Sequence, residues 1–207
     1  MNGAARGAFC TLVLALWCAH SAAAPNSLRV DGGTDRVVIP NAPALNPSGA
    51  VTLEAWVRPT TTSGCLTIVG KNYTTGYWLG LCDGRIRYYT NSFGSQLDGS
   101  GTVSVGEWTH VAVTFDGNRR VYYINGVVDL DTVSPSTLPV NLDSIGIGGE
   151  ATPTCGGNTC PFFGDLAEVR LWDKARTQTE IRRDIVRQLE APRDGLVAVW
   201  HLEGNAQ

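Results

Sequence analysis

The chain has 207 residues, of which 43% are hydrophobic and 17% are charged, and its formal net charge at pH 7 is −3. This profile excludes a disordered chain, and the 24 glycines favour a turn-rich all-β domain. The length suits a single sandwich domain. No basic run alternates with aromatic residues, so nucleic acid is not an expected partner.

The N-terminus has the three parts of a secretory signal peptide. Arg6 supplies the positive charge, Ala8–Ala19 is apolar, and Ser21–Ala24 offers small residues for cleavage. The apolar run is too short to span a bilayer comfortably, and an uncleaved anchor is the alternative. We therefore expect residues 1–23 to be a signal peptide and residues 25–207 to be one secreted domain that does not insert into membranes.

The stretch 108–129 predicts three antiparallel strands. Apolar and polar residues alternate there with a period of two, and a turn cluster follows Phe115. If that turn pairs Phe115 with Arg120, the apolar side chains gather on one face. Asn125-Gly126 predicts a second, two-residue turn, because both of its positions need positive φ. Such a unit buries only one face, so a second sheet must cover it.

Further elements follow from the same patterns. Val51–Arg58 and Asp165–Asp173 alternate as strands, and Val30–Pro40 predicts a strand pair around a tight turn. Thr177 and Glu180 have the spacing of a capping box, which predicts one helix near the C-terminus. Within the second strand the residues expected to face one way are Ala167, Val169 and Leu171.

Four cysteines remain after signal removal: Cys65, Cys82, Cys155 and Cys160. An even number in a secreted chain predicts disulfides, with three possible connectivities. Pairing Lys71 with the glycine five residues later places Cys65 opposite Cys82, which leaves Cys155 and Cys160 to close a small loop. A four-thiolate zinc site is the alternative, but its usual spacings are absent.

Four stretches, in this order, resemble the LamG-like jelly-roll domains of the concanavalin A-like lectin/glucanase superfamily, which includes the pentraxins. They are Ser27–Pro40, Val51–Pro59, Trp108–Val128 and Phe163–Asp173. The resemblance covers about residues 27–190. It implies an all-β, two-sheet antiparallel jelly-roll sandwich with one short helix toward the C-terminus. In related proteins a segment like GLVAVWHLEGNA introduces further sequence, which leaves open that this chain is a fragment of a longer protein.

Catalysis has little support in the sequence. The related glucanases carry two glutamates on one strand, four residues apart with an aspartate midway, and no such run exists here. Glu54 and Glu168 could meet across strands, but we expect them to form ion pairs with Arg58 and Arg170 instead. His110 and His201 lie in apolar strands without a serine or cysteine partner. We therefore expect a protein that is not an enzyme, with a divergent glycoside hydrolase or polysaccharide lyase as the alternative.

Glycan binding has more support. The Asp83-Gly84 turn places Trp78 opposite Tyr89, on the face away from the apolar side chains of the same hairpin. Two neighbouring rings there would form an aromatic platform for a sugar, unless a long loop covers them. The predicted function is a recognition module for carbohydrate or an extracellular protein, and a structural or adhesion module is a further alternative.

The sequence also suggests a calcium site and a glycosylation site. Many jelly-roll domains of the superfamily hold a structural calcium ion between loops, and Asp31 and Asp165 occupy turn-adjacent positions that could bind it. Ordinary turn carboxylates are the alternative interpretation. Asn72-Tyr73-Thr74 is an acceptor sequence for N-glycosylation if the host is a eukaryote.

Overall fold

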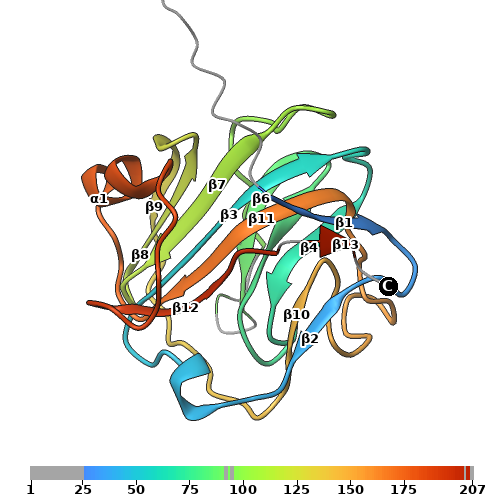
Figure 1. The fold of residues 1–207 in the computed structure, drawn as a ribbon. Helices are drawn as coiled ribbons and strands as arrows, with labels where there is room; N and C mark the ends of the chain where they lie inside the picture. The colour runs from blue at the N-terminus through green and yellow to red at the C-terminus, as the bar shows by residue number, and fades with distance from the viewer. Residues whose placement is uncertain (1–25, 91–92, 94–95, 203, 206–207) are drawn as a thin grey trace, which may run out of the picture.

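The computed structural model describes residues 26–90, 93, 96–202 and 204–205. The expected signal peptide, residues 1–23, lies outside this part of the chain. Within it, the strands form two sheets that face each other (Figure 1). Neighbouring strands are antiparallel except for the short β13, which runs parallel to β1. This arrangement confirms the expected jelly-roll sandwich.

The larger sheet has eight strands, in the order β13-β1-β11-β3-β7-β8-β9, with β12 also paired to β11. The smaller sheet has five strands, in the order β2-β10-β4-β5-β6. The larger sheet comprises β1 (Leu28–Asp31), β3 (Val51–Pro59), β7 (Thr109–Phe115), β8 (Arg119–Ile124), β9 (Val127–Val133), β11 (Phe163–Trp172), β12 (Leu196–Trp200) and β13 (Gly204–Asn205). The smaller comprises β2 (Val37–Ile39), β4 (Cys65–Gly70), β5 (Trp78–Cys82), β6 (Arg85–Tyr89) and β10 (Ile145–Ile147).

The hairpin predictions are confirmed. Phe115 pairs with Arg120 across β7 and β8, and Trp78 pairs with Tyr89 across β5 and β6. The turn residue Asn125 has a φ of +50°, as the two-residue turn requires. The alternation of apolar residues therefore fixes which face of each of these strands points into the core.

The first predicted strand pair is wrong. Although Val30–Pro40 does contain two strands, β1 pairs with β11 in the larger sheet and β2 pairs with β10 in the smaller one. The turn at Gly32 thus carries the chain from one sheet to the other. Each strand gains its hydrogen bonds from a distant partner, which local sequence does not reveal.

Two bulges change the expected side-chain directions. In β11 the pairing with β3 shifts between Ala167 and Arg170, and Glu168 has a φ of +51°. An extra residue reverses the alternation. Leu166 therefore joins Val169 and Leu171 in the core cluster, and the expectation that Ala167 faces the same way as these two residues is wrong. In β4 the pairing with β5 shifts between Thr67 and Val69, so the expected register holds only at the cysteine end of the hairpin.

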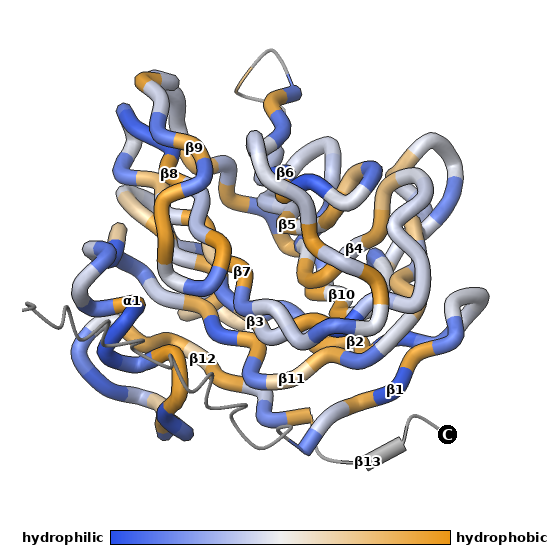
Figure 2. Tube along the Cα trace, turned by 90° about the horizontal axis from the view of Figure 1, so that it is seen from above, coloured by the Kyte–Doolittle hydropathy of each residue, from blue (hydrophilic) through white to orange (hydrophobic). Residues whose placement is uncertain are grey.

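The main core lies between the sheets, and a second layer lies outside the larger sheet. The helix α1 (Gln178–Asp184) begins at the expected capping box, in which Thr177 and Glu180 satisfy each other's backbone N–H groups. Figure 2 shows α1 against the side of the larger sheet that faces away from the smaller one. There Ile181 packs on Ala112 and Tyr123. A short 3-10 helix, η1 (Pro43–Leu45), lies in the connection between β2 and β3. Among the described residues, no helix is both long and apolar enough to cross a bilayer.

Candidate functional site

Trp78 lies on the outer face of the smaller sheet, as predicted, but it is fully buried. Its indole lies flat over two glycines: an added Cβ at Gly70 would come within 2.7 Å of Trp78 Cδ1, and one at Gly80 would also collide with the ring. The Nε1–H group donates a hydrogen bond to Thr67 Oγ1 at 2.9 Å. The prediction that Trp78 offers an exposed aromatic platform is therefore wrong, because a neighbouring segment covers it.

The covering side chain is Tyr73, from the connection between β4 and β5. Its ring meets the edge of Trp78 with centroids 5.2 Å apart and stacks on Tyr89 with centroids 4.5 Å apart and an interplanar angle of 23°. Both tyrosines are partly exposed. The aromatic surface is thus made by Tyr73 and Tyr89, called here the tyrosine pair, and Trp78 supports it from below. The sequence prediction included Tyr89 and missed Tyr73.

Tyr73 is held in place through its backbone. Asn72 has a φ of +102°, and its Oδ1 accepts a hydrogen bond from the Thr74 N–H at 2.9 Å, which closes a tight turn. The Tyr73 N–H donates to Oε1 of Glu150, and the Thr154 hydroxyl donates to the other oxygen of the same carboxylate. Glu150 is fully buried, and burial raises the pKa of its carboxyl. A distant carboxylate therefore fixes the backbone that carries the exposed ring.

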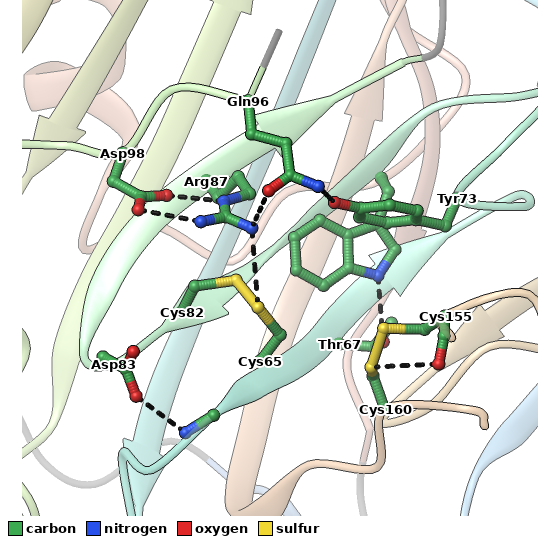
Figure 3. The surroundings of a disulfide bond; sticks show 12 residues. Cys65, Thr67, Tyr73, Cys82, Asp83, Arg87, Gln96, Asp98, Cys155 and Cys160 are labelled. Carbon is green, nitrogen blue, oxygen red and sulfur yellow. Dashed lines mark hydrogen bonds and ion pairs between the residues drawn. A yellow bond between two sulfur atoms is a disulfide. The ribbon is translucent and has the colours of Figure 1, made fainter. Parts of the chain in front are cut away.

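Both predicted disulfides are present and flank this surface (Figure 3). Cys65 and Cys82 lie directly opposite each other on β4 and β5, with Cα atoms 4.0 Å apart. Cys155 and Cys160 close the loop that follows Glu150. This loop docks on β4, where the Thr67 N–H donates to the carbonyl of Cys160 at 2.8 Å. The loop next to Glu150, whose carboxylate binds the Tyr73 backbone, is thus itself hydrogen-bonded to the sheet.

A polar rim borders the tyrosine pair. The Arg87 guanidinium binds Asp98 through two contacts, Nε to Oδ1 at 2.5 Å and Nη2 to Oδ2 at 2.8 Å. Its Nη1 donates to Gln96 Oε1 at 2.9 Å, and Gln96 Nε2 donates to the Tyr73 hydroxyl at 2.6 Å. Figure 3 shows this chain of contacts running from Asp98 to Tyr73. Because Arg87 is neutralised by Asp98, the rim offers hydrogen-bonding groups rather than an uncompensated charge.

Asn72 remains a predicted glycosylation site. Its Nδ2, the atom that would carry the sugar, donates to Asp143 Oδ2 at 2.7 Å. The side chain is half-buried, and its Oδ1 caps the turn described above. A sugar on Nδ2 would therefore compete with the contact to Asp143 and would lie beside Tyr73.

The two aspartates expected to bind calcium lie near each other but are engaged by arginine. Arg29 Nη1 and Arg58 Nε both contact Asp165 Oδ2, at 3.1 Å and 3.0 Å. Arg29 Nε also contacts Asp31 Oδ1 at 3.3 Å. A divalent cation here would sit beside two guanidinium groups, so the arrangement does not fit a metal site well. The described residues contain no cluster of three or more potential metal ligands. Calcium binding stays a prediction to be measured.

The carboxylates considered for catalysis lie beneath α1. Glu54 is fully buried, and its Oε1 accepts hydrogen bonds from Trp172 Nε1 at 2.9 Å and Arg176 Nη1 at 3.0 Å. Glu168 contacts Arg170 Nη2 at 2.9 Å, as expected, and His201 Nδ1 at 2.5 Å. The pairing of Glu54 with Arg176 instead of Arg58 was not predicted. These carboxylates neutralise arginines and do not face an open surface.

His110 belongs to the same buried layer. It is 1% exposed, and its Nε2 lies 3.6 Å from Glu54 Oε2. Burial, together with the charges of Arg170 and Arg176, lowers the pKa of His110 to about 3. Its ring packs edge-on against Trp56. The imidazole is therefore neutral at physiological pH and has a buried, structural position.

Similar solved structures share this fold. A protein from Bacteroides ovatus ATCC 8483, provisionally described as carbohydrate-binding, matches with a TM-score of 0.70 and 19% identity, over 84% of this chain and 51% of its own. This chain thus spans about half of that protein. The CBM40 module of the Ruminococcus gnavus IT-sialidase, bound to α2,3-sialyllactose, matches with a TM-score of 0.61 and 15% identity, over 76% of this chain and 95% of its own.

A third similar structure is domain 4 of AbnA, an extracellular arabinanase from Geobacillus stearothermophilus, in complex with arabinotriose. It has a TM-score of 0.55 and 19% identity, over 80% of this chain and 87% of its own. At these identities the likeness concerns the fold alone. A comparison with curated proteins finds no match. The family model of the concanavalin A-like lectin/glucanases superfamily matches residues 31–182. The chain therefore belongs to the concanavalin A-like lectin/glucanases superfamily.

Proposed function

We propose that this chain is a non-catalytic module that binds glycans through the tyrosine pair and its polar rim. The observation that carries the proposal is the partly exposed stack of Tyr73 on Tyr89, supported from below by Trp78. An aromatic ring can lie against the C–H face of a sugar. A ring held by a fixed backbone loses little conformational entropy on binding. Gln96 and Asp98 supply hydrogen-bonding groups for sugar hydroxyls at the edge of the stack.

The position of the acidic residues supports a role without catalysis. Hydrolysis of a glycosidic bond usually requires two carboxyl groups that flank it. Glu54 and Glu168 instead form buried ion pairs with arginines, beneath α1. Glu54 is fully buried and Glu168 is 8% exposed, so a sugar could reach them only if the segments around them moved and left those charges unpaired, which is energetically costly.

The similar structures support carbohydrate as the ligand class, since two of them are complexes with sialyllactose and arabinotriose. We extend the proposal to location: the module is secreted. The disulfides are typical of proteins that fold in oxidising compartments, and residues 1–23 have the pattern of a signal peptide. An extracellular protein is the alternative partner for the same surface.

A glycan array followed by calorimetry on the mature chain would test the proposal. Tyr89→Ala should weaken binding at least about fivefold, because truncating a residue central to binding costs more than about 1 kcal/mol. Tyr73→Phe serves as the matched control: it keeps the stacked ring, loses the hydroxyl that contacts Gln96 and Arg87, and should retain most of the affinity. The module should release no product from the glycans it binds. Binding that survives both Tyr89→Ala and Tyr73→Ala in folded protein would refute the site.

A further inference from the structure

A second surface feature lies at the far end of the same hairpin. It is a shallow pocket of about 450 Å³ lined by Thr60, Thr61, Thr62, Ser63, Asp83 and Val105. The pocket is wide open to solvent. The lining comes from three separate connections: the segment between β3 and β4, the turn between β5 and β6, and the segment before β7.

The chemistry of the pocket suits a sugar. Asp83 is exposed, and its Oδ1 accepts a hydrogen bond from the Gly64 N–H at 2.8 Å, which fixes the carboxylate while the rest of the group faces outward. Three threonines and one serine add hydroxyl groups to the lining. Val105 is 53% exposed and supplies an apolar wall. A carboxylate and hydroxyls beside an apolar surface match the alternating hydroxyl and C–H faces of a sugar ring.

The pocket and the tyrosine pair share one face of the protein. Asp83 lies in the turn between β5 and β6, and Tyr89 ends β6. The surface between them is formed by the outward side chains of Arg85 and Arg87 and by the Cys65–Cys82 bridge. Figure 3 shows Asp83, the disulfide, Arg87, Gln96 and Tyr73 following one another across this face. Six residues of extended chain separate Asp83 from Tyr89, which corresponds to roughly 20 Å.

The connecting surface is fixed rather than flexible. Arg85 Nη1 donates to the Gly99 carbonyl at 3.1 Å, and Arg87 is held by Asp98. The segment after Asp98 runs along β6, where the Gly99 N–H donates to Ile86 O at 2.8 Å. The disulfide joins β4 to β5 at the pocket end. A ligand that spanned both features would thus meet a preformed surface and would pay little to order it.

We propose that the pocket is a second subsite, and that the ligand is a linear oligosaccharide long enough to contact the tyrosine pair and Asp83 together. This inference rests on the proposed glycan-binding function and adds the size of the ligand. Two linked contacts raise affinity by making the second one intramolecular. Affinity should therefore increase with chain length until the oligosaccharide reaches the pocket, and then remain constant.

The test uses cello-, xylo-, malto- and arabino-oligosaccharides of one to six residues, titrated into the mature protein by calorimetry. Asp83→Asn keeps a residue that tolerates the φ of +48° at this turn but removes the charge. It should weaken binding of the longest members about tenfold, the effect of losing a charge-assisted hydrogen bond, and leave the shortest binding members unchanged. Val105→Glu should act in the same way by filling the pocket. Val133→Glu, at a valine that is 67% exposed on β9, is the matched control and should bind like the wild type.

The outcomes separate the two proposals. A length-dependent gain that Asp83→Asn and Val105→Glu abolish, while Val133→Glu does not, supports the second subsite. Affinity that does not change with length, or equal losses for short and long members in the pocket variants, overturns the subsite and leaves glycan binding intact. No binding of any member, with no response on a wider glycan array, overturns glycan binding itself and the subsite with it.

Discussion

The burial of Trp78 can be tested through the glycine beneath it. Gly70 lies under the indole, and the three atoms nearest to a Cβ added there all belong to the Trp78 ring, at 2.7, 3.4 and 3.6 Å. The indole of Trp78 can therefore occupy its position only because residue 70 has no side chain. Gly70→Ala should force the ring to move, whereas the same change in a Trp78→Ala background should enter space that the ring has left.

The expected magnitudes follow from burial. Trp78 is fully buried and donates one hydrogen bond to Thr67, so Trp78→Ala should lower the free energy of unfolding by about 3–5 kcal/mol. Gly70→Ala alone should cost about 1–3 kcal/mol through overpacking. In the Trp78→Ala background it should be neutral or should stabilise by up to about 1 kcal/mol, because alanine restricts the unfolded chain more than glycine does.

Urea unfolding of the four proteins in this double-mutant cycle measures the coupling directly. Gly80→Ala is the control, because its Cβ would also collide with the backbone carbonyl of Leu66 and so should not be rescued by Trp78→Ala. A loss below about 1 kcal/mol for Trp78→Ala would mean that the ring is not buried. Equal costs of Gly70→Ala in both backgrounds would show that the ring does not lie over Gly70.

Three further predictions concern protonation, the small disulfide loop and calcium. The pKa of His110 is lowered to about 3 in the folded protein, whereas an unfolded histidine titrates near 6.5, so protons bind the unfolded chain first. The contribution of His110 to stability should be complete above about pH 7.5 and should fall by roughly 2–3 kcal/mol as the pH is lowered to about 4.5, measured as the difference from His110→Gln; a parallel pH dependence of both proteins would contradict this. Replacing Cys155 and Cys160 together by serine should cost about 2 kcal/mol of stability and should weaken glycan binding, since the loop helps to hold Tyr73; unchanged affinity would argue against that support. If the arginine contacts exclude a metal, calcium should not raise the melting temperature of EDTA-treated protein, whereas a rise that Asp165→Asn abolishes would establish the calcium site.

The two-residue turns and the strands around them could be predicted from sequence. Asn125-Gly126 and Asp83-Gly84 need positive φ at adjacent positions, which few residue pairs tolerate, so each turn fixes the register of its hairpin. The disulfide between Cys65 and Cys82 was predicted from pairing Lys71 with Gly76. In the structure the Lys71 N–H bonds to the Tyr77 carbonyl instead, and the one-residue shift at the bulge in β4 offsets this difference, so that Cys65 still lies opposite Cys82.

The bulges themselves could not be predicted. Glu168 adopts a positive φ without being glycine, and the cost of that conformation is met by packing on strands that are far away in sequence. Glu54 pairs with Arg176 for a similar reason, since the segment leading to α1 returns across the sheet. Local patterns show which face a side chain takes, but not which distant group will meet it there.

The candidate site shows the same limit. The sequence placed Trp78 and Tyr89 side by side on the outer face, and this is correct. It did not show that Tyr73 would cover Trp78, because the position of Tyr73 depends on a hydrogen bond to Glu150, which lies 77 residues away. The exposed aromatic surface therefore differs from the prediction by one ring, because Tyr73 and not Trp78 is the exposed partner of Tyr89.

The most direct test of glycan recognition by the tyrosine pair is NMR mapping with a bound oligosaccharide. The mature protein, labelled with 15N and with 13C in its aromatic rings, would be titrated with the strongest ligand from the array. The account predicts that the largest shifts occur at the rings of Tyr73 and Tyr89 and at the side-chain amide of Gln96, with little change in α1. Shifts centred on α1 and the outer face of the larger sheet, with Tyr73 and Tyr89 unaffected, would contradict it.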